Sequence, residues 1–335
     1  MSNENTLLFF FILLNFLIII FFDKIKIFKI NIDNPDNKRK LHHEPTPLAG
    51  GMIVFLNLFL YFIIVQLNQD FLVNEFIFDN KSFVLFFFTS LFIFILGFFD
   101  DKYNFSASFK FLIITFIILS ILFFDNDLNI KIIKFSFLNN EFYIHSYSII
   151  FTTFCFLVFL NAFNMFDGIN LQSSIYSIII FLSILFFYFD SLLIKVILIS
   201  ILGYSYLNFK NKVFLGDSGS LLLAFIIGYI FIKLYNFEKI NFTDEIVIYM
   251  LVPGTDLIRL FFKRLYLKKN PLTPDRFHIH HLLTLKYSHF KSVLILLSLI
   301  ILPIGMTYFN INSLLIIILF VIFYSILIKI VLLKN

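Results

Sequence analysis

Two adjacent aspartates, Asp100 and Asp101, end a long apolar run in the stretch GFFDD. An ionised carboxylate at the centre of a membrane helix costs about 2.5 to 3.5 kcal/mol on insertion scales, so such a pair needs a compensating charge. Lys102 follows directly, and Lys110 lies a little over two helical turns further on. The pair is therefore a candidate for binding a cation or a charged substrate, and a solvated helix end is the structural alternative.

A second polar stretch, NAFNMFDGIN, closes another apolar run. Its Asn161, Asn164 and Asp167 are spaced by three, so on an α-helix they share an arc of about 120°. A polar stripe at the end of a membrane helix faces a protein cavity or water rather than lipid. These side chains are therefore candidates for the same site as the aspartate pair.

A third stretch, FLGDSGSLLLAF, places Asp217 between Gly216 and Gly219. The two glycines leave room for close approach to the backbone. Ser218 or Ser220 could instead cap the following helix, which is the structural alternative.

Two basic stretches accompany these acids. The first, DNPDNKRKLHHEPTPLAGG (33–51), places Arg39 and Lys40 before a proline-stiffened turn and a glycine pair. This arrangement favours backbone positioned for a phosphate, and a positively charged membrane anchor is the structural alternative.

The second basic stretch, RLYLKKNPLTPDRFHIHHLL (264–283), brings His278, His280 and His281 close to Arg264 in the sequence. Zinc is disfavoured because the spacing is not HExxH and no Cys or Glu lies nearby to complete a tetrahedral set. Imidazoles and guanidiniums beside acidic loops suit phosphate recognition better.

The five stretches combine carboxylates, amides and bases in a way that favours a divalent cation. Mg²⁺ characteristically pairs one or two protein carboxylates with substrate phosphates. We interpret Asp100 and Asp101 as carboxylates held apart by a metal–pyrophosphate cluster, with the bases binding the remaining phosphate charge. The sequence therefore predicts phosphoryl chemistry at a membrane surface.

The composition requires membrane helices to position these residues. Of the 335 residues 60% are hydrophobic, and the mean hydropathy is +0.95, which is too apolar for a soluble protein of this size. No barrel-like alternation is present, so α-helices are the spanning elements. The single cysteine, Cys155, excludes an intrachain disulfide and a cysteine-rich metal site.

The sequence predicts an all-α integral membrane protein with about eleven transmembrane helices in one domain, 1–335. The expected spans are 6–22, 50–66, 82–99, 109–124, 147–163, 168–189, 191–207, 219–235, 245–261, 292–308 and 312–328. The segment 126–146 alternates like a strand pair around Asn139-Asn140, which predicts a small extracytoplasmic β-hairpin.

The charges orient these spans. With eleven spans, one side holds 20 Lys and Arg and the other holds 6, which together are all 26. The positive-inside rule makes the first side cytoplasmic, and that side carries all five polar stretches. The N-terminal stretch lacks the charge order of a cleaved signal, so we expect a retained first helix with its N-terminus outside.

These motifs resemble those of the polyprenyl-phosphate N-acetylhexosamine-1-phosphate transferase superfamily, the glycosyltransferase 4 family. The stretches RKLHHEPTPLAGG, GFFDD, NAFNMFDG, GDSGS and DRFHIHH occur in the family's order. The string HIHH resembles the WecA-like branch, the undecaprenyl-phosphate N-acetylglucosamine-1-phosphate transferases. The chain departs from the family's usual Asp-Gly-x-x-Gly-Leu, because DGINLQ lacks the second glycine, which bears on helix packing and sugar preference.

The resemblance implies a role for each candidate. Asp217 and Asp100 become metal ligands, and Asp100, Asp101 and Asp167 become the catalytic acids. The implied substrate-binding residues are Arg39, Lys40, Lys110, Asn161, Asn164, Arg264, His278, His280 and His281. The implied cofactor is Mg²⁺, with Mn²⁺ as an alternative.

The implied reaction is transfer of HexNAc-1-phosphate from a UDP-HexNAc to undecaprenyl phosphate, with release of UMP. The expected partners are these two substrates and membrane lipid, with no nucleic acid; a homodimer stays open. The expected location is the bacterial inner membrane, where the product would start a cell-envelope glycan. A multi-span transporter is the main rival, but transport predicts charges near span midpoints and repeat symmetry, and neither is present.

Overall fold

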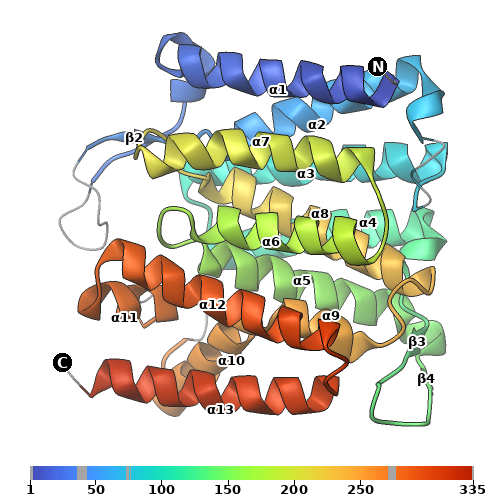
Figure 1. Cartoon of the computed structure of the whole chain (residues 1–335), viewed down its shortest axis with the longest axis vertical. Helices are drawn as coiled ribbons and strands as arrows, with labels where there is room; N and C mark the ends of the chain where they lie inside the picture. The colour runs from blue at the N-terminus through green and yellow to red at the C-terminus, as the bar shows by residue number, and fades with distance from the viewer. Residues whose placement is uncertain (1–2, 36–43, 73–74, 76, 271–276, 334–335) are drawn as a thin grey trace.

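The computed structural model describes residues 3–35, 44–72, 75, 77–270 and 277–333, and these are mostly helical (Figure 1). The α-helices are α1 (Asn3–Phe21), α2 (Gly50–Leu67), α3 (Asn80–Tyr103), α4 (Ala107–Phe124), α5 (Ser148–Phe166), α6 (Gln172–Phe187), α7 (Leu192–Phe209), α8 (Gly216–Asn236), α9 (Thr243–Tyr249), α10 (Leu251–Tyr266), α11 (Ile279–Lys286), α12 (His289–Tyr308) and α13 (Ser313–Leu332). Short 3₁₀ turns are η1 (Phe22–Lys24), η2 (Lys26–Lys29), η3 (Gln69–Leu72), η4 (Asn126–Leu128) and η5 (His145–Tyr147).

Nine helices of the described chain are long and apolar enough to cross a membrane. They are α1 to α5, α7, α8, α12 and α13, and they lie side by side with their axes across the view in Figure 1. The prediction of an all-α multi-span membrane protein is therefore confirmed. The chain also starts and ends at opposite ends of the bundle, as an odd number of crossings requires.

Helix α8 forms the centre of the bundle. Every residue from Ser218 to Tyr235 is buried, and α8 packs against α2, α3, α5 and α6. A helix that is apolar on all sides is stable only when other helices surround it. By contrast α1, α4 and α13 leave large apolar side chains exposed, as expected for helices that face lipid.

Two predicted spans differ from the sequence prediction. The segment 168–189 forms α6, an apolar helix shorter than the nine spanning ones. The segment 245–261 is divided at Met250 into α9 and α10. Pro253 supplies no backbone N–H in the first turn of α10, and Asp256 and Arg259 follow on the same helix. These polar side chains and the proline disfavour one continuous apolar span.

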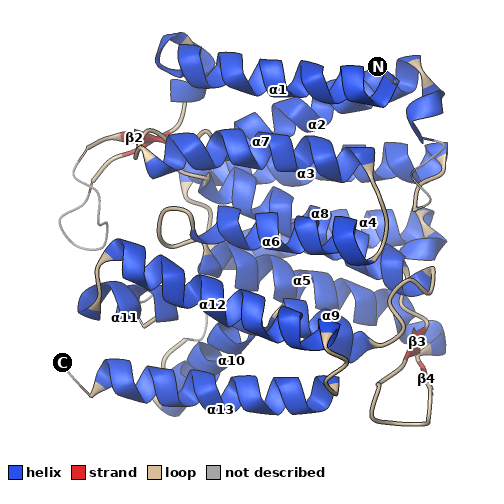
Figure 2. Ribbon diagram, viewed as in Figure 1, coloured by secondary structure: helices blue, strands red, loops and turns tan. Residues whose placement is uncertain are grey.

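The hairpin expected in 126–146 is present but short. Strands β3 (Ile132–Ile133) and β4 (Phe142–Tyr143) pair antiparallel, with Ile132 opposite Tyr143. A second pair that the sequence did not predict, β1 (Ile32–Asp33) and β2 (Thr46–Pro47), lies at the other end of the bundle (Figure 2). The two pairs therefore mark opposite ends of the helices.

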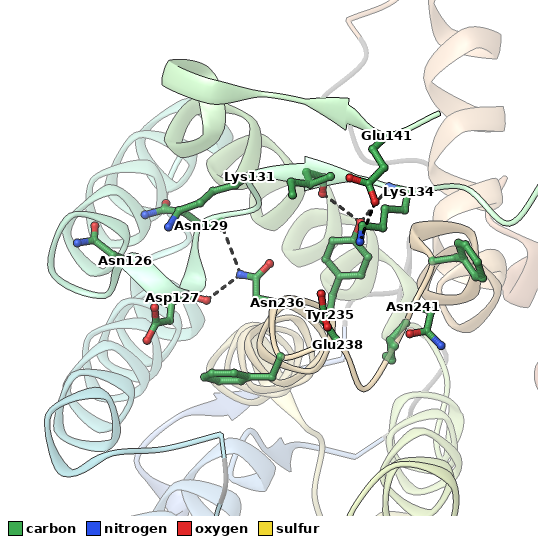
Figure 3. A pocket seen from close by; sticks show the side chains of 14 residues that line it. Asn126, Asp127, Asn129, Lys131, Lys134, Glu141, Tyr235, Asn236, Glu238 and Asn241 are labelled. Carbon is green, nitrogen blue, oxygen red and sulfur yellow. Dashed lines mark hydrogen bonds and ion pairs between the residues drawn. The ribbon is translucent and has the colours of Figure 1, made fainter. Parts of the chain in front are cut away.

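A cavity of about 540 Å³ opens between the β3–β4 hairpin and the end of α8 (Figure 3). In it Lys134 pairs with Glu141 at 3.0 Å, and the Asn236 amide donates to the carbonyl oxygen of Asp127 at 2.7 Å. Asn236 ends α8, whereas Asp217 lies in its first turn, so the two are about 28 Å apart at 1.5 Å per residue. This cavity is thus far from the acidic stretches.

Candidate active site

Three helix ends bring Asp100, Lys110 and Asp217 together. The Lys110 ammonium, near the start of α4, donates to Asp100 at the end of α3. The same ammonium donates to Asp217 in the first turn of α8 at 2.6 Å. Asp100 is buried, while the Asp217 side chain is 34% exposed, so the cluster opens on the Asp217 side.

The amide stripe on α5 contributes one residue to this cluster. Asn164 donates to Asp217 at 3.0 Å and to the Ser220 hydroxyl at 2.8 Å. Asn161 instead donates to the carbonyl oxygen of Leu157, on its own helix, at 2.7 Å. The structure therefore joins Asn164 to the candidate site, whereas the Asn161 amide is bonded within its own helix.

Asp101 binds the start of α8 and not the Lys110 ammonium. Its two carboxylate oxygens accept the backbone N–H groups of Asp217 at 2.7 Å and Ser218 at 3.1 Å. A carboxylate at a helix N-terminus satisfies backbone donors and interacts favourably with the helix dipole. In the structure the two carboxylates therefore bind different partners, and the predicted metal–pyrophosphate cluster between them stays a prediction.

We expect Asp101→Ala to lower stability by about 1 kcal/mol, the usual cost of losing a helix cap. Turnover should fall by more than this loss of stability explains, because without the Asp101 carboxylate the first turn of α8, which carries Asp217, is no longer held in place. Thermal unfolding in detergent and turnover, measured on the same preparation, test this. Asp79→Ala is the matched control, since Asp79 caps α3 through Ser82; equal loss of activity in both variants would contradict the special role of Asp101.

The glycine pair of PTPLAGG, at the start of α2, is hydrogen-bonded to the two residues that precede α8. The Gly50 and Gly51 N–H groups donate to the carbonyl oxygens of Phe214 and Leu215 at 2.9 and 3.0 Å. A Cβ added at Gly51 would lie 2.4 Å from the backbone nitrogen of Gly219. The prediction that this backbone binds a phosphate is therefore corrected, because these two amides are already bonded within the protein.

Asp167 lies just beyond the end of α5 and next to the histidines. Burial raises the pKa of its carboxyl to about 7, opposed by the nearby Ser173 hydroxyl and helped by the negative charge of Asp217. A Cβ added to Gly168 would lie only 1.9 Å from Nε2 of His280. The close approach of α11 to this turn therefore requires a glycine directly after Asp167.

His280 is buried, and its ring is neutral. Burial, and then the neighbouring His281 and His278, hold the pKa of His280 well below its usual range. The Gln172 amide nitrogen lies 3.4 Å from Nδ1 of His280, and a neutral ring that accepts there carries its hydrogen on Nε2, beside Gly168. His280 is thus a neutral hydrogen-bond donor and not a cation.

The other two histidines flank that ring in different surroundings. His278 stacks on His280 with ring centroids 5.5 Å apart and is also buried. His281 is only partly buried, with its ring 4.2 Å from that of His280. Among the three, His281 is therefore the most accessible to a ligand.

Asp256 is a site residue that the sequence analysis missed. It lies on α10 and is 2% exposed, yet its carboxylate contacts His278 at 2.7 Å, Arg259 at 2.7 Å and Tyr324 at 2.6 Å. Asp256 stands 22 residues before His278, inside a segment interpreted as a membrane span. No local spacing pattern links the two residues, so the sequence carried no signal for the contact.

The remaining predicted residues are placed as follows. Arg264 is buried on α10. Arg39 and Lys40 lie outside the described residues. The structure therefore leaves the predicted phosphate contacts of these two untested.

The missing family glycine falls at Leu171, whose φ is +70°. This left-handed conformation costs a non-glycine residue on the order of 1 to 2 kcal/mol. The strain persists because the Leu171 N–H donates to Asn208 at 2.7 Å and Leu171 directly precedes α6 as its N-cap residue. The backbone of this turn thus keeps a glycine-like conformation although the glycine is absent.

The acids of the cluster suit one magnesium ion with phosphate ligands. Asp100 and Asp217 contact the same ammonium, so a cation entering between them would meet two carboxylates. Mg²⁺ is commonly held by one or two carboxylates together with substrate phosphates and water. The described residues contain no group of three or more His, Cys, Asp or Glu that could hold a metal without such a substrate.

The region that carries this cluster matches a known family. Residues 83–235 match the family model described as Glycosyl transferase family 4, and this range includes Asp100, Lys110, Asn164, Asp167 and Asp217. The resemblance predicted from the sequence is therefore confirmed.

Several named enzymes resemble a larger part of the chain. The undecaprenyl-phosphate alpha-N-acetylglucosaminyl 1-phosphate transferase of Thermotoga maritima is 28% identical over 270 residues, covering 80% of this chain and 77% of the relative. A probable undecaprenyl-phosphate N-acetylglucosaminyl 1-phosphate transferase of Bacillus subtilis is 28% identical, with coverages of 79% and 73%. The Escherichia coli K12 enzyme of the first name is 27% identical, with coverages of 76% and 70%.

Proposed function

We propose that this protein is a membrane phosphosugar transferase that moves N-acetylglucosamine-1-phosphate from a UDP-sugar to undecaprenyl phosphate. The observation that carries the proposal is the Asp100–Lys110–Asp217 cluster, assembled from three helix ends inside the matched region. The names of the similar enzymes supply the acceptor lipid and the sugar phosphate. The UDP donor and the release of UMP follow from the family resemblance.

In the proposed reaction a phosphate oxygen of undecaprenyl phosphate attacks the β-phosphorus of the UDP-sugar. A new P–O bond forms, the bond from the β-phosphorus to the bridging oxygen breaks, and UMP leaves with that oxygen. A phosphomonoester has its second pKa near ~6, so the nucleophile is already largely ionised at neutral pH. The protein therefore needs mainly to align two anions and reduce their repulsion.

Lys110 is suited to reduce that repulsion. Its ammonium is shared by two carboxylates in the described structure, and phosphate oxygens entering the open side at Asp217 would compete for it. Asn164 orients Asp217 through its amide. Asp167, with a pKa of about 7, can hold or release a proton near neutral pH beside the reacting phosphates.

Asp217 and Asp100 are the residues that would hold Mg²⁺, or Mn²⁺ in its place. The ion would supply positive charge to the phosphate oxygens when bound. Asp217 is the more accessible of the two carboxylates, which favours it as the residue that meets a metal–nucleotide complex.

The nucleotide end of the donor is assigned to the histidine helix α11. His281 is partly exposed, so it suits a direct hydrogen bond to diphosphate oxygens. The buried His278 and His280 are less suited to direct contact, and His280 packs against Gly168. This division refines the equal roles that the sequence predicted for the three histidines.

The decisive test of this function is an assay of the purified protein with undecaprenyl phosphate and a panel of labelled UDP-sugars. We expect a lipid product from UDP-N-acetylglucosamine, UMP in equal amount, and no product in excess EDTA until Mg²⁺ is restored. Failure with every UDP-HexNAc would overturn the proposed function. Product formation in EDTA would remove the metal from it.

We further propose that the active-site end of the bundle faces the cytoplasm of the bacterial inner membrane, from the 20-to-6 charge division. Cysteine labelling in a Cys155→Ala background tests this. An impermeant maleimide added to intact spheroplasts should label Asn140→Cys, in the hairpin loop, and should label Lys102→Cys only after lysis. Both positions are exposed in the structure; labelling of Lys102→Cys in intact spheroplasts would reverse the orientation.

A further inference from the structure

Asp256 is the point at which two helices, α10 and α13, meet the histidine helix α11. Its Oδ1 atom accepts hydrogen bonds from Arg259 on its own helix and from Tyr324 on α13, at 2.7 and 2.6 Å. Its Oδ2 atom lies 2.7 Å from Nδ1 of His278. A buried carboxylate that lacked such partners would be strongly destabilising, so the carboxylate and its partners form one unit.

The same carboxylate also holds the start of α11. The N–H of Ile279, the first residue of α11, donates to Oδ1 of Asp256 at 3.2 Å. Arg259 donates to the carbonyl oxygen of Phe277, directly before the histidines, at 2.5 Å. Both the N-terminal amide of α11 and the chain leading into it are therefore bound through Asp256 and its ion-pair partner.

This anchoring determines where the histidine rings lie. An ionised carboxylate facing Nδ1 requires a hydrogen on that nitrogen, which fixes the orientation of the His278 ring. The ring of His278 is nearly parallel to that of His280, with an interplanar angle of 8°. His280 in turn lies against Gly168, so the chain of contacts runs from Asp256 to the turn that carries Asp167.

We propose that Asp256 is a positioning residue that orients His278 and places α11 so that His281, beside His280, meets the sugar nucleotide; this rests on the proposed function. Asp256 itself is buried and bonded within the protein, so it does not touch substrate. Its removal should therefore impair binding of the nucleotide and leave binding of the lipid phosphate unchanged. A residue that serves stability alone would affect both substrates equally.

The test compares Asp256→Asn with Tyr324→Phe, which removes one hydrogen bond to Oδ1 and keeps the charge. We expect Asp256→Asn to raise the KM for UDP-N-acetylglucosamine at least tenfold and Tyr324→Phe to raise it two- to fivefold. The KM for undecaprenyl phosphate should change less than twofold in each. Tyr143→Phe, which removes a surface hydrogen bond to Glu141 in the distant hairpin, is the matched control.

A double variant separates positioning from an independent contribution. Because Asp256 acts partly through His278 and partly through the start of α11, adding Asp256→Asn to His278→Ala should raise the nucleotide KM by a smaller factor than Asp256→Asn does in the native chain. Fully multiplicative effects, or equal rises in KM for both substrates, would overturn the proposal.

Hydrogen exchange gives a readout that does not depend on activity. Backbone amides of α11 should exchange at least tenfold faster in Asp256→Asn than in the native chain, while those of α8 stay unchanged. Unchanged exchange in α11 would overturn the anchoring role even in an active enzyme. Faster exchange in a protein that transfers no HexNAc-1-phosphate would instead reject the proposed function and keep the anchor.

Discussion

Asp217→Asn is expected to lower turnover by on the order of 10³-fold while the protein stays folded. Loss of one well-placed electrostatic group in an active site commonly costs a factor of 10² to 10³. Asp217 is at the upper end of that range because its carboxylate binds both Lys110 and Asn164 and is the exposed side of the cluster. The asparagine keeps the shape and can still accept one hydrogen bond, so the fold should survive.

The measurement is turnover of purified protein in detergent, together with thermal unfolding. Asp190→Asn is the matched control, because Asp190 also forms an ion pair with a lysine, Lys195, but is exposed at the far end of the bundle. It should retain native turnover. Turnover of Asp217→Asn within threefold of the native rate would remove this carboxylate from the mechanism.

Asp217 also shows what the sequence could predict. Each polar stretch is contiguous and borders an apolar run, so the place of Asp217 at a helix end could be predicted from the position of that run alone. Lys110 and Asn164 were predicted as substrate-binding residues, and the structure brings both to Asp217. The oxygen atoms that face each partner could not be predicted, because they depend on how three helices rotate about their axes.

The contacts of Asp101 and Asp256 could not be predicted from the sequence. Asp101 was grouped with Asp100 because the two are adjacent, yet neighbouring residues on a helix point about 100° apart and these two bind different partners. Asp256 was overlooked because the segment around it was interpreted as an apolar span. Its function emerges only from α10, α11 and α13 packing together, which no local pattern encodes.

Gly97 determines how closely α3 packs against α8, and so how close Asp100 lies to Asp217. Gly97 on α3 lies directly against the first turn of α8, where a Cβ would be 2.5 Å from Cα of Ser218 and 2.6 Å from the carbonyl oxygen of Asp217. Both atoms belong to the backbone, so neither can rotate away. Any side chain at this position must separate α3 from α8, and with them Asp100 from Asp217.

We therefore expect Gly97→Ala to destabilise the protein and to reduce activity together. Overpacking of this kind typically costs about 1 to 3 kcal/mol, which exceeds the gain of about 1 kcal/mol from replacing glycine by alanine within a helix. A displacement of about 1 Å in a catalytic group can lower the rate by about 10²-fold. Thermal unfolding and turnover of the same preparation measure both effects.

Gly305→Ala is the control, and we expect it to raise stability where Gly97→Ala lowers it. Gly305 is also inside a helix, α12, but a Cβ there meets no atom within 4 Å. This variant should keep native turnover and gain up to about 1 kcal/mol from helix propensity alone. The contrast isolates close approach at α3 and α8 from the general effect of adding a methyl group. If Gly97→Ala proved as stable and active as Gly305→Ala, the tight α3–α8 contact could not be what holds Asp217 beside Lys110.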